Sequence, residues 1–115
     1  GIALAWEKSL KYKKKFNYYL WLNDDTYLFP DAIKNLLMCK KIVSSDEFIS
    51  VGSTCDDNLK KRTYGGSINL KNKIRVFKNK IVYPNKNFQF IHGFNGNIVL
   101  IPHKAFIKIG KFTIN

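Results

Sequence analysis

The stretch that decides the fold is YYLWLNDDT at residues 18–26, where an uninterrupted apolar run stops at two adjacent carboxylates, Asp24 and Asp25. An apolar run without alternation is typical of a strand buried on both faces, as in the parallel sheets of α/β proteins. In such sheets the carboxyl ends of the strands face the ligand crevice. Carboxylates at that point can hold a hard divalent cation, which in turn can bridge the oxygens of a diphosphate. The stretch therefore indicates chemistry on a diphosphate leaving group.

The composition indicates one globular domain. The chain has 115 residues, of which 45% are hydrophobic and 15% aromatic, and this is enough for a packed core. No apolar stretch approaches the roughly 20 residues needed to cross a bilayer, and we expect a cytoplasmic protein. Because the chain begins at Gly1, within a helical pattern, and its one methionine is Met38, we expect it to be a piece of a longer protein. Cys39 and Cys55 show no zinc or redox spacing and are expected to be free thiols.

The charge of the chain raises a second class of partner. Its formal net charge is +12, which is compatible with nucleic acid, an anionic membrane surface or phosphorylated substrates. Only Arg62 and Arg75 are arginines, and lysine lacks the planar fork that favours phosphate and base recognition. A solvated basic face is therefore the favoured interpretation. A non-catalytic basic module that binds nucleic acid or an anionic membrane surface is the alternative function.

The first half of the chain predicts a β-loop-α-β unit. Apolar residues at helical spacing predict a helix over 2–14, and the apolar run predicts a strand over 18–22. Pro30 fits the first position of a second helix that runs to about Val43, and a short strand follows over 48–52. We expect the two strands to be parallel and joined by a right-handed crossover, with the acids in the first loop.

The second half predicts shorter elements. Residues 53–61 are polar and loop-like, and Gly65 and Gly66 break the backbone. Extended hairpin segments are expected at 74–77, 80–83 and 86–91. A turn at 94–97 precedes a strand at 98–101, and Pro102 then opens a last helix that Gly110 can close.

Three motifs span nearly the whole chain: LNDDT at 22–26, TYGG at 63–66 and FNGNIVLIP at 94–102. In this order and spacing they resemble bacterial family-2 glycosyltransferases, especially the rhamnosyltransferase-like enzymes of surface polysaccharide synthesis. The resemblance implies an α/β fold of the nucleotide-sugar-binding type, GT-A-like and Rossmann-like, with a mixed sheet and flanking helices. It also implies that residues 1–115 are a single partial catalytic domain, without the N-terminal nucleobase-binding part and the C-terminal catalytic-base part.

The resemblance implies a metal-dependent transfer of a sugar from a nucleotide-sugar donor to a saccharide or lipid-linked acceptor, with inversion, at the inner face of the plasma membrane. Asn23 takes the first acidic position of the Asp-x-Asp motif and would be a donor-binding residue together with Asp24 and Asp25. Asp25 would be the direct ligand of Mg²⁺ or Mn²⁺, and Asp24 would contact the ribose or the sugar of the donor. A bound cation would stabilise the charge of the departing diphosphate. The general base is expected beyond Asn115, so we expect little or no transfer activity from these residues alone and no nucleic acid partner.

The remaining candidates for sugar or acceptor binding are Tyr64, Gly65, Gly66, Asn95, Gly96 and Asn97. The glycines permit close approach of backbone to a ligand, and the asparagine amides match sugar hydroxyls. A bend between strands and a plain hairpin turn are the respective alternatives, and an ordinary turn is the alternative for Asp24 and Asp25. His92 is interpreted as a packed residue and not as a base. Trp6 and Trp21 are interpreted as core side chains and not as sugar-stacking groups.

Overall fold

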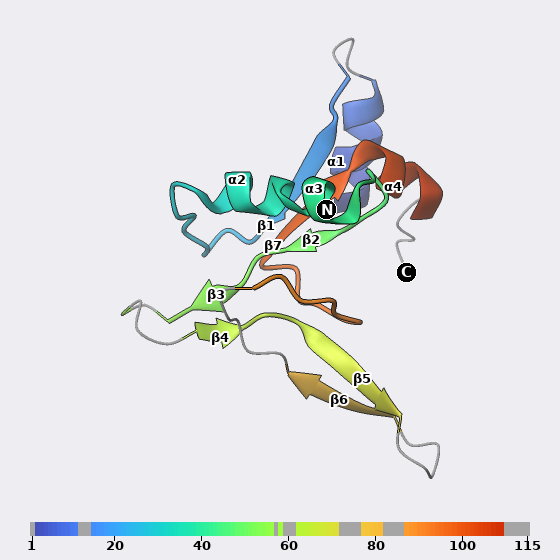
Figure 1. Cartoon of the computed structure of the whole chain (residues 1–115). Helices are drawn as coiled ribbons and strands as arrows, with labels where there is room; N and C mark the ends of the chain where they lie inside the picture. Colours follow the sequence, from blue (N-terminus) through green and yellow to red (C-terminus); the bar gives the residue numbers. More distant parts are fainter. Residues whose placement is uncertain are drawn as a thin grey trace.

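A computed structural model describes residues 2–11, 15–56, 58, 62–71, 77–81 and 87–109 of the chain (Figure 1). The elements in chain order are α1 (Ile2–Leu10), β1 (Tyr18–Leu22), α2 (Ala32–Leu37), α3 (Cys39–Val43), β2 (Ser50–Val51), β3 (Thr54–Cys55), β4 (Arg62–Tyr64), β5 (Ser67–Lys71), β6 (Phe77–Ile81), β7 (Ile98–Pro102) and α4 (His103–Ile109). The fold is a small mixed α/β domain whose paired strands are antiparallel throughout the described residues.

The central sheet is built around β7, which lies between β1 and β2 and is antiparallel to both. All five residues of β7 are buried, whereas Leu20 and Leu22 of β1 are exposed. The predicted bounds of β1 are confirmed, but its predicted burial on both faces is wrong. Among the described strands β1 lies at the edge of the sheet, so part of its apolar surface has no covering element. The strand that is buried on both faces is β7.

The first two strands run in the same direction, as predicted, because both are antiparallel to β7, but β7 lies between them. The expected mixed sheet is wrong, because every described strand pair is antiparallel. The physical reason is long-range. β1 and β7 are apolar strands of equal length, so neither sequence alone decides which of them is central, and β7 arrives more than 45 residues after β2.

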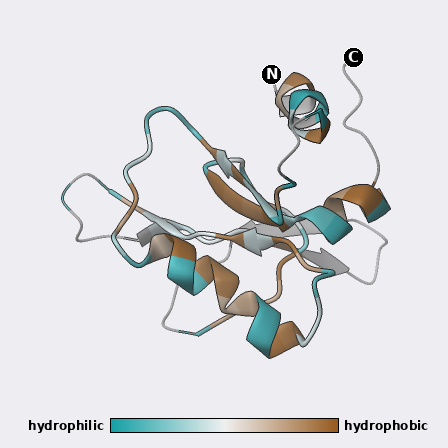
Figure 2. Ribbon diagram, turned by 90° about the horizontal axis from the view of Figure 1, so that it is seen from above, coloured by the Kyte–Doolittle hydropathy of each residue, from teal (hydrophilic) through white to brown (hydrophobic). Residues whose placement is uncertain are grey.

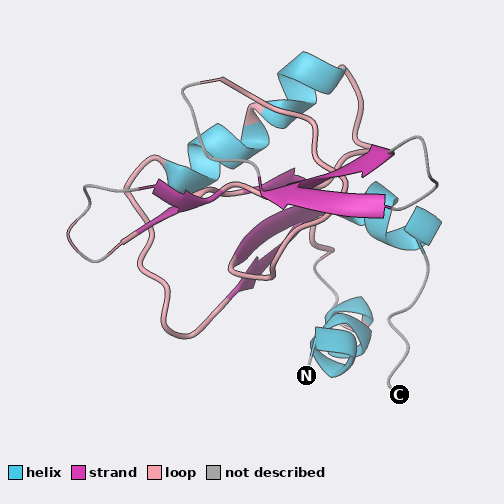
Figure 3. Ribbon diagram, turned by 90° about the horizontal axis from the view of Figure 1, so that it is seen from below, coloured by secondary structure: helices cyan, strands magenta, loops and turns pink. Residues whose placement is uncertain are grey.

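The two faces of β7 carry two separate parts of the core, because successive side chains of a strand point to opposite faces. On one face Val99 and Ile101 pack with Ala105 and Phe106 of α4. On the other face the packing partner of β7 is α2. That second cluster consists of Leu36, Ile98 and Leu100, with Tyr18, Ala32 and Leu37 packed against it. Figures 2 and 3 show α2 and α3 on one side of the sheet and α1 on the other.

The helices follow the sequence with shifted ends. α1 is confirmed over Ile2–Leu10, and residues 12–14 of its predicted range lie outside the described residues. The predicted helix from Pro30 to Val43 is two helices that meet at Met38, whose N–H donates to the oxygens of both Lys34 and Asn35 at 3.2 Å. The last helix, α4, begins directly after Pro102, while Gly110 lies outside the described residues.

The middle of the chain forms two small antiparallel pairs. β3 pairs with β4, so the segment predicted as a loop over 53–61 contains a short strand, and residues 57 and 59–61 lie outside the description. β5 pairs with β6 in a hairpin that projects from the central sheet (Figure 1). Of the three predicted hairpin segments only 77 and 80–81 fall in a described strand. Residues 74–76, 82–83 and 86 lie outside the description, and 87–91 form no strand.

Two further expectations about the chain can be compared with the structure. Cys39 and Cys55 are free thiols, as predicted. No helix within the described part of the chain is both long enough and apolar enough to span a membrane.

Candidate functional site

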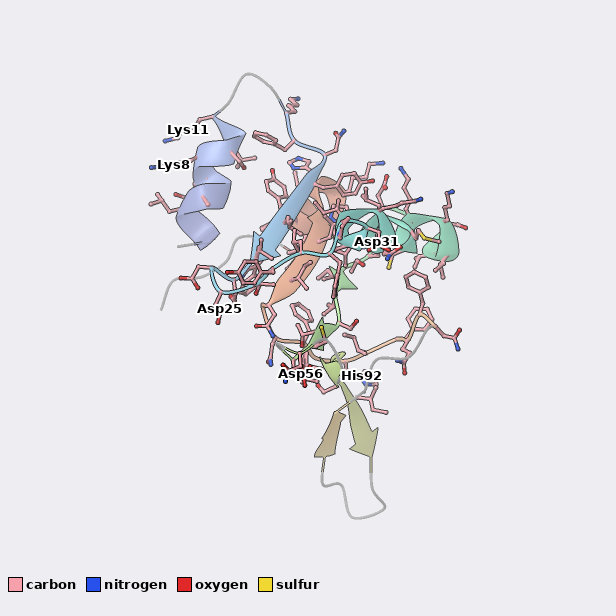
Figure 4. The ribbon with its side chains drawn as sticks, turned by 90° about the vertical axis from the view of Figure 1, so that its left-hand side faces the viewer. Lys8, Lys11, Asp25, Asp31, Asp56 and His92 are labelled. Carbon is pink, nitrogen blue, oxygen red and sulfur yellow. The ribbon has the colours of Figure 1, made fainter. Side chains whose placement is uncertain are left out.

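The two adjacent acids lie in a tight turn at the end of β1. The N–H of Thr26 donates to the oxygen of Asn23 at 3.3 Å, so Asp24 and Asp25 occupy the two middle positions of the turn. Both side chains are exposed. Figure 4 shows Asp25 at the outer edge of the molecule, apart from Asp31 at the start of α2. The turn thus presents two carboxylates to solvent, and neither of them caps α2, which has Asp31 at its N-cap.

The Asp turn is joined to the Asn95–Gly96–Asn97 turn by a pair of hydrogen bonds. The Asn23 side chain donates from Nδ2 to Oδ1 of Asn97 at 2.8 Å, and the Asn23 backbone N–H donates to the Asn97 oxygen at 3.1 Å. These contacts continue the β1–β7 ladder one position beyond the Leu22–Ile98 pair. Asn23 therefore has a structural role, the attachment of one turn to the other, that the sequence did not predict. It brings together two predicted site segments that lie more than 70 residues apart.

Gly96 is required by the packing of Trp21. A Cβ atom at Gly96 would lie 2.4 Å from Cζ2 of the indole and 2.5 Å from Cε2. Trp21 itself packs against the cluster that contains Val99 and Phe106. The interpretation of Trp21 as a core residue is confirmed, whereas the side chain of Trp6 lies outside the description. The Asn-Gly-Asn turn is thus held against the sheet by a large aromatic ring.

The Tyr64–Gly65–Gly66 segment joins β4 to β5. Gly66 has a φ of +107°, a conformation that glycine adopts without steric cost, and a Cβ there would lie 2.4 Å from Cδ1 of Ile91. The next residue, Ser67, exchanges backbone hydrogen bonds with Gly93 at 2.8 and 3.1 Å. The bend between strands is therefore present. It anchors the hairpin to the segment that precedes the Asn-Gly-Asn turn.

His92, which the sequence predicted to be packed, is not buried in the structure. The His92 side chain is exposed, so the predicted packed position is wrong. Its backbone N–H donates to the oxygen of Ser67 at 2.8 Å. The aromatic run around His92 does not create a buried cluster there, because Phe90 is 88% exposed. The apolar residues next to His92 in the sequence therefore do not predict whether its side chain is buried.

The charged groups of α3 and α4 form their own network. Asp46 contacts Lys40 at 3.3 Å and Lys104 at 3.7 Å, and Lys108 donates to Glu47 at 2.7 Å. The hydrogen bond and the charge of Asp46 raise the pKa of Lys40 above its ordinary value. These lysines are locally neutralised, which agrees with a solvated basic face more than with a binding surface at this end of the fold.

The donor set of the Asp turn fits a cation that is shared with a substrate. Within the described residues no three or more His, Cys, Asp or Glu side chains are grouped as they would be in a metal site made by the protein alone. Asp24 and Asp25 are exposed and take no part in the ion pairs of the described chain. Mg²⁺ is commonly bound through one or two carboxylates together with substrate phosphates. Two accessible carboxylates in one turn match that requirement.

Comparisons with known proteins leave the chain without an assigned relative. No protein-family model matches it, and neither a curated protein nor a solved structure matches it significantly.

Proposed function

We propose that this chain is part of a metal-dependent, inverting glycosyltransferase that moves a sugar from a nucleotide-sugar donor to a saccharide or lipid-linked acceptor in cell-surface polysaccharide synthesis. One observation carries the proposal. The exposed Asp24–Asp25 turn is hydrogen-bonded through Asn23 to Asn97 of the Asn-Gly-Asn turn. Two motifs that resemble those of family-2 glycosyltransferases thus lie side by side at one end of β1 and β7.

The proposal gives the residues of the two turns separate tasks. Asp25 binds a divalent cation together with the donor diphosphate, and Asp24 contacts the ribose or the sugar. The cation supplies charge stabilisation as the diphosphate leaves. Asn23 fixes the turn through the hydrogen bond from its Nδ2 to Asn97, and its second N–H and its Oδ1 can still contact the donor. The finer fold description, a GT-A-like nucleotide-sugar domain, is part of the same proposal.

The pairing of Asn23 with Asn97 also explains how the Asp24–Asp25 turn can be exposed to solvent and still be held in one conformation. A metal site needs carboxylates that reach solvent, yet a flexible turn would lose entropy each time it bound a ligand. The two hydrogen bonds and the Gly96–Trp21 contact hold both turns against the buried sheet. The carboxylates are then held in place before the donor arrives.

The test is residue-resolved NMR of the chain titrated with trace Mn²⁺ and uridine diphosphate. Paramagnetic broadening centred on residues 23–27 is expected, because the unpaired electrons relax only nearby nuclei. Asp25→Asn should abolish the broadening. Asp31→Asn is the matched control, since it removes an exposed carboxylate of the same loop without touching the turn.

Two results would count against the proposal. Broadening that persists in Asp25→Asn, or that is equally lost in Asp31→Asn, shows that the turn does not select the cation. A well-dispersed spectrum without focal broadening, together with polyanion binding that falls steeply with salt, favours the basic-module alternative.

A further inference from the structure

A pocket lies beside α2 and β2, and neither Asp24 nor Asp25 lines it. It has a volume of about 530 Å³ and is lined by α2, β2, Gly65 and residues 87–89 and 91. This volume lies within the range of about 300–1,000 Å³ that is usual for small-molecule sites. Ile98, the neighbour of Asn97, also lines it. The pocket wall therefore includes Gly65 of the Gly-Gly bend and the first residue of β7, but no residue of the Asn-Gly-Asn turn.

Two polar side chains of the pocket are available to a ligand. Asp31 and Asn35 are one helical turn apart, and the N–H of Asn35 donates to the Asp31 oxygen at 2.9 Å, so their side chains lie on the same side of α2. Asp31 makes no side-chain capping bond. Both residues are exposed, and neither side chain makes a hydrogen bond or ion pair within the described part of the chain. A carboxylate that accepts and an amide that both donates and accepts suit adjacent hydroxyl groups.

Two aromatic rings lie at the same pocket. Phe29 and Phe88 line it, and they are 53% and 51% exposed. About half of the surface of each ring is therefore accessible to a ligand. The faces of aromatic rings are electronegative and attract weakly positive C–H groups. A ligand with a C–H face and a hydroxyl edge would use the rings and the polar pair together.

The lining also excludes other ligand classes. Among the described residues that form the wall there is no lysine or arginine, although the chain carries a net charge of +12. A phosphate or another anion would meet the carboxylate of Asp31 without a cationic partner. An acyl chain would leave the Asp31 and Asn35 side chains buried without hydrogen bonds. A neutral polyhydroxylated ring avoids both penalties.

We infer that this pocket is a saccharide-binding site, in which Asp31 and Asn35 bind hydroxyl groups and Phe88 and Phe29 contact the C–H face of the sugar ring. Its role as the acceptor subsite rests on the proposed function, because Ile98, which follows the Asn-Gly-Asn turn in the chain, lines the pocket. Saccharide binding itself does not depend on that proposal. The inference assigns specificity to residues that none of the three sequence motifs contains.

The experiment uses the full chain and a set of methyl glycosides of glucose, galactose, N-acetylglucosamine and rhamnose. Each is titrated to millimolar concentration while amide chemical shifts are recorded, without metal or nucleotide. At least one glycoside should give saturable shifts at residues 29–36 and 87–91. Asp31→Ala and Asn35→Ala should each weaken that binding about tenfold, equivalent to about 1.4 kcal/mol, and Phe88→Ala should weaken it as well. Phe88→Tyr, which keeps an aromatic face, should retain it.

The control variant is Glu7→Ala, which removes an exposed carboxylate of α1 outside the pocket and should leave glycoside binding unchanged. The inference is overturned if the folded chain shows no saturable shift with any of the four glycosides. It is also overturned if shifts occur but Asp31→Ala, Asn35→Ala and Phe88→Ala all bind as the parent does. Because the Mn²⁺ and uridine diphosphate titration reports on residues 23–27, failure of the saccharide site and failure of the proposed transferase function give different results.

Discussion

Replacing Gly96 by alanine tests how the candidate site is held to the core. The added Cβ would lie 2.4 Å from Cζ2 and 2.5 Å from Cε2 of Trp21, well inside van der Waals contact. The indole is rigid and packs against the cluster around Val99, so it cannot simply rotate away. Overpacking of this kind typically costs about 1–3 kcal/mol. Alanine also lowers the entropy of the unfolded chain, which offsets about 0.4–1 kcal/mol. The net loss of unfolding free energy should be about 1–2 kcal/mol.

The assay is urea unfolding followed by far-UV circular dichroism, with thermal unfolding in parallel. For a domain of this size, that loss corresponds to a fall in Tm of about 4–8 °C. Gly93→Ala is the matched control. Its Cβ would meet only the Ser67 hydroxyl, at 2.8 Å, and this small side chain can change rotamer. Gly93→Ala should therefore change stability much less than Gly96→Ala.

A double-mutant cycle decides whether the ring is the cause. In a Trp21→Leu background the space next to Gly96 is larger, so the cost of Gly96→Ala should nearly disappear. If Gly96→Ala costs the same free energy in both backgrounds, the contact with the indole is not what requires glycine. The inferred anchoring of the Asn-Gly-Asn turn would then be refuted.

Three further predictions concern the pairing, the charge network and the core. Asn23→Ala and Asn97→Ala should each lower the unfolding free energy by about 1 kcal/mol, since each removes the 2.8 Å hydrogen bond between the two side chains. In a double-mutant cycle measured by urea unfolding the two effects should be non-additive. Additive losses would show that the hydrogen bond contributes nothing to stability. The raised pKa of Lys40 means that the folded state favours the protonated amine. The stabilising contact with Asp46 is therefore fully present below the unfolded pKa of Lys40, about 10.4, and is lost as pH rises through the higher folded pKa. The stability difference between the parent and Lys40→Met, measured by urea unfolding, should therefore shrink above that pH, and a difference that grows would contradict the sign. Leu100→Ala empties a site that is only 3% exposed in the central strand and should cost about 2–5 kcal/mol in the same assay, whereas a cost below about 1 kcal/mol would mean that β7 is not the centre of the core.

The position of the Asp turn could be predicted from the sequence because the signals are local. The bounds of β1 follow from the apolar run, and the turn at its end follows from the preference of Asn and Asp for turns. The break at Gly66 follows in the same way from the freedom of glycine at positive φ. The start of α4 after Pro102 and the free state of Cys39 and Cys55 were also predictable.

The candidate site as a whole could not be predicted in that way. The sequence gives no local sign that the Asn23 amide bonds to Asn97, because the two residues meet only after β1 and β7 pair. The saccharide pocket likewise depends on α2 and residues 87–91 lying on the same side of the sheet. Phe29 and Phe88 each read as ordinary apolar residues until their exposure at one pocket is known.

The sequence by itself therefore determined α1, β1, β7 and α4, since hydrophobic periodicity, proline and glycine act over a few residues, but not the short strands between β2 and β6. Only the tertiary structure decided the order of the strands. An apolar strand can bury its side chains against several different elements, so its sequence does not specify its neighbours. The free energy of burial depends on all the residues that pack together. β7 takes the centre because its five residues are buried completely there, and β1 and β2 are left at its two sides. That arrangement is what brings the Asp turn and the Asn-Gly-Asn turn together.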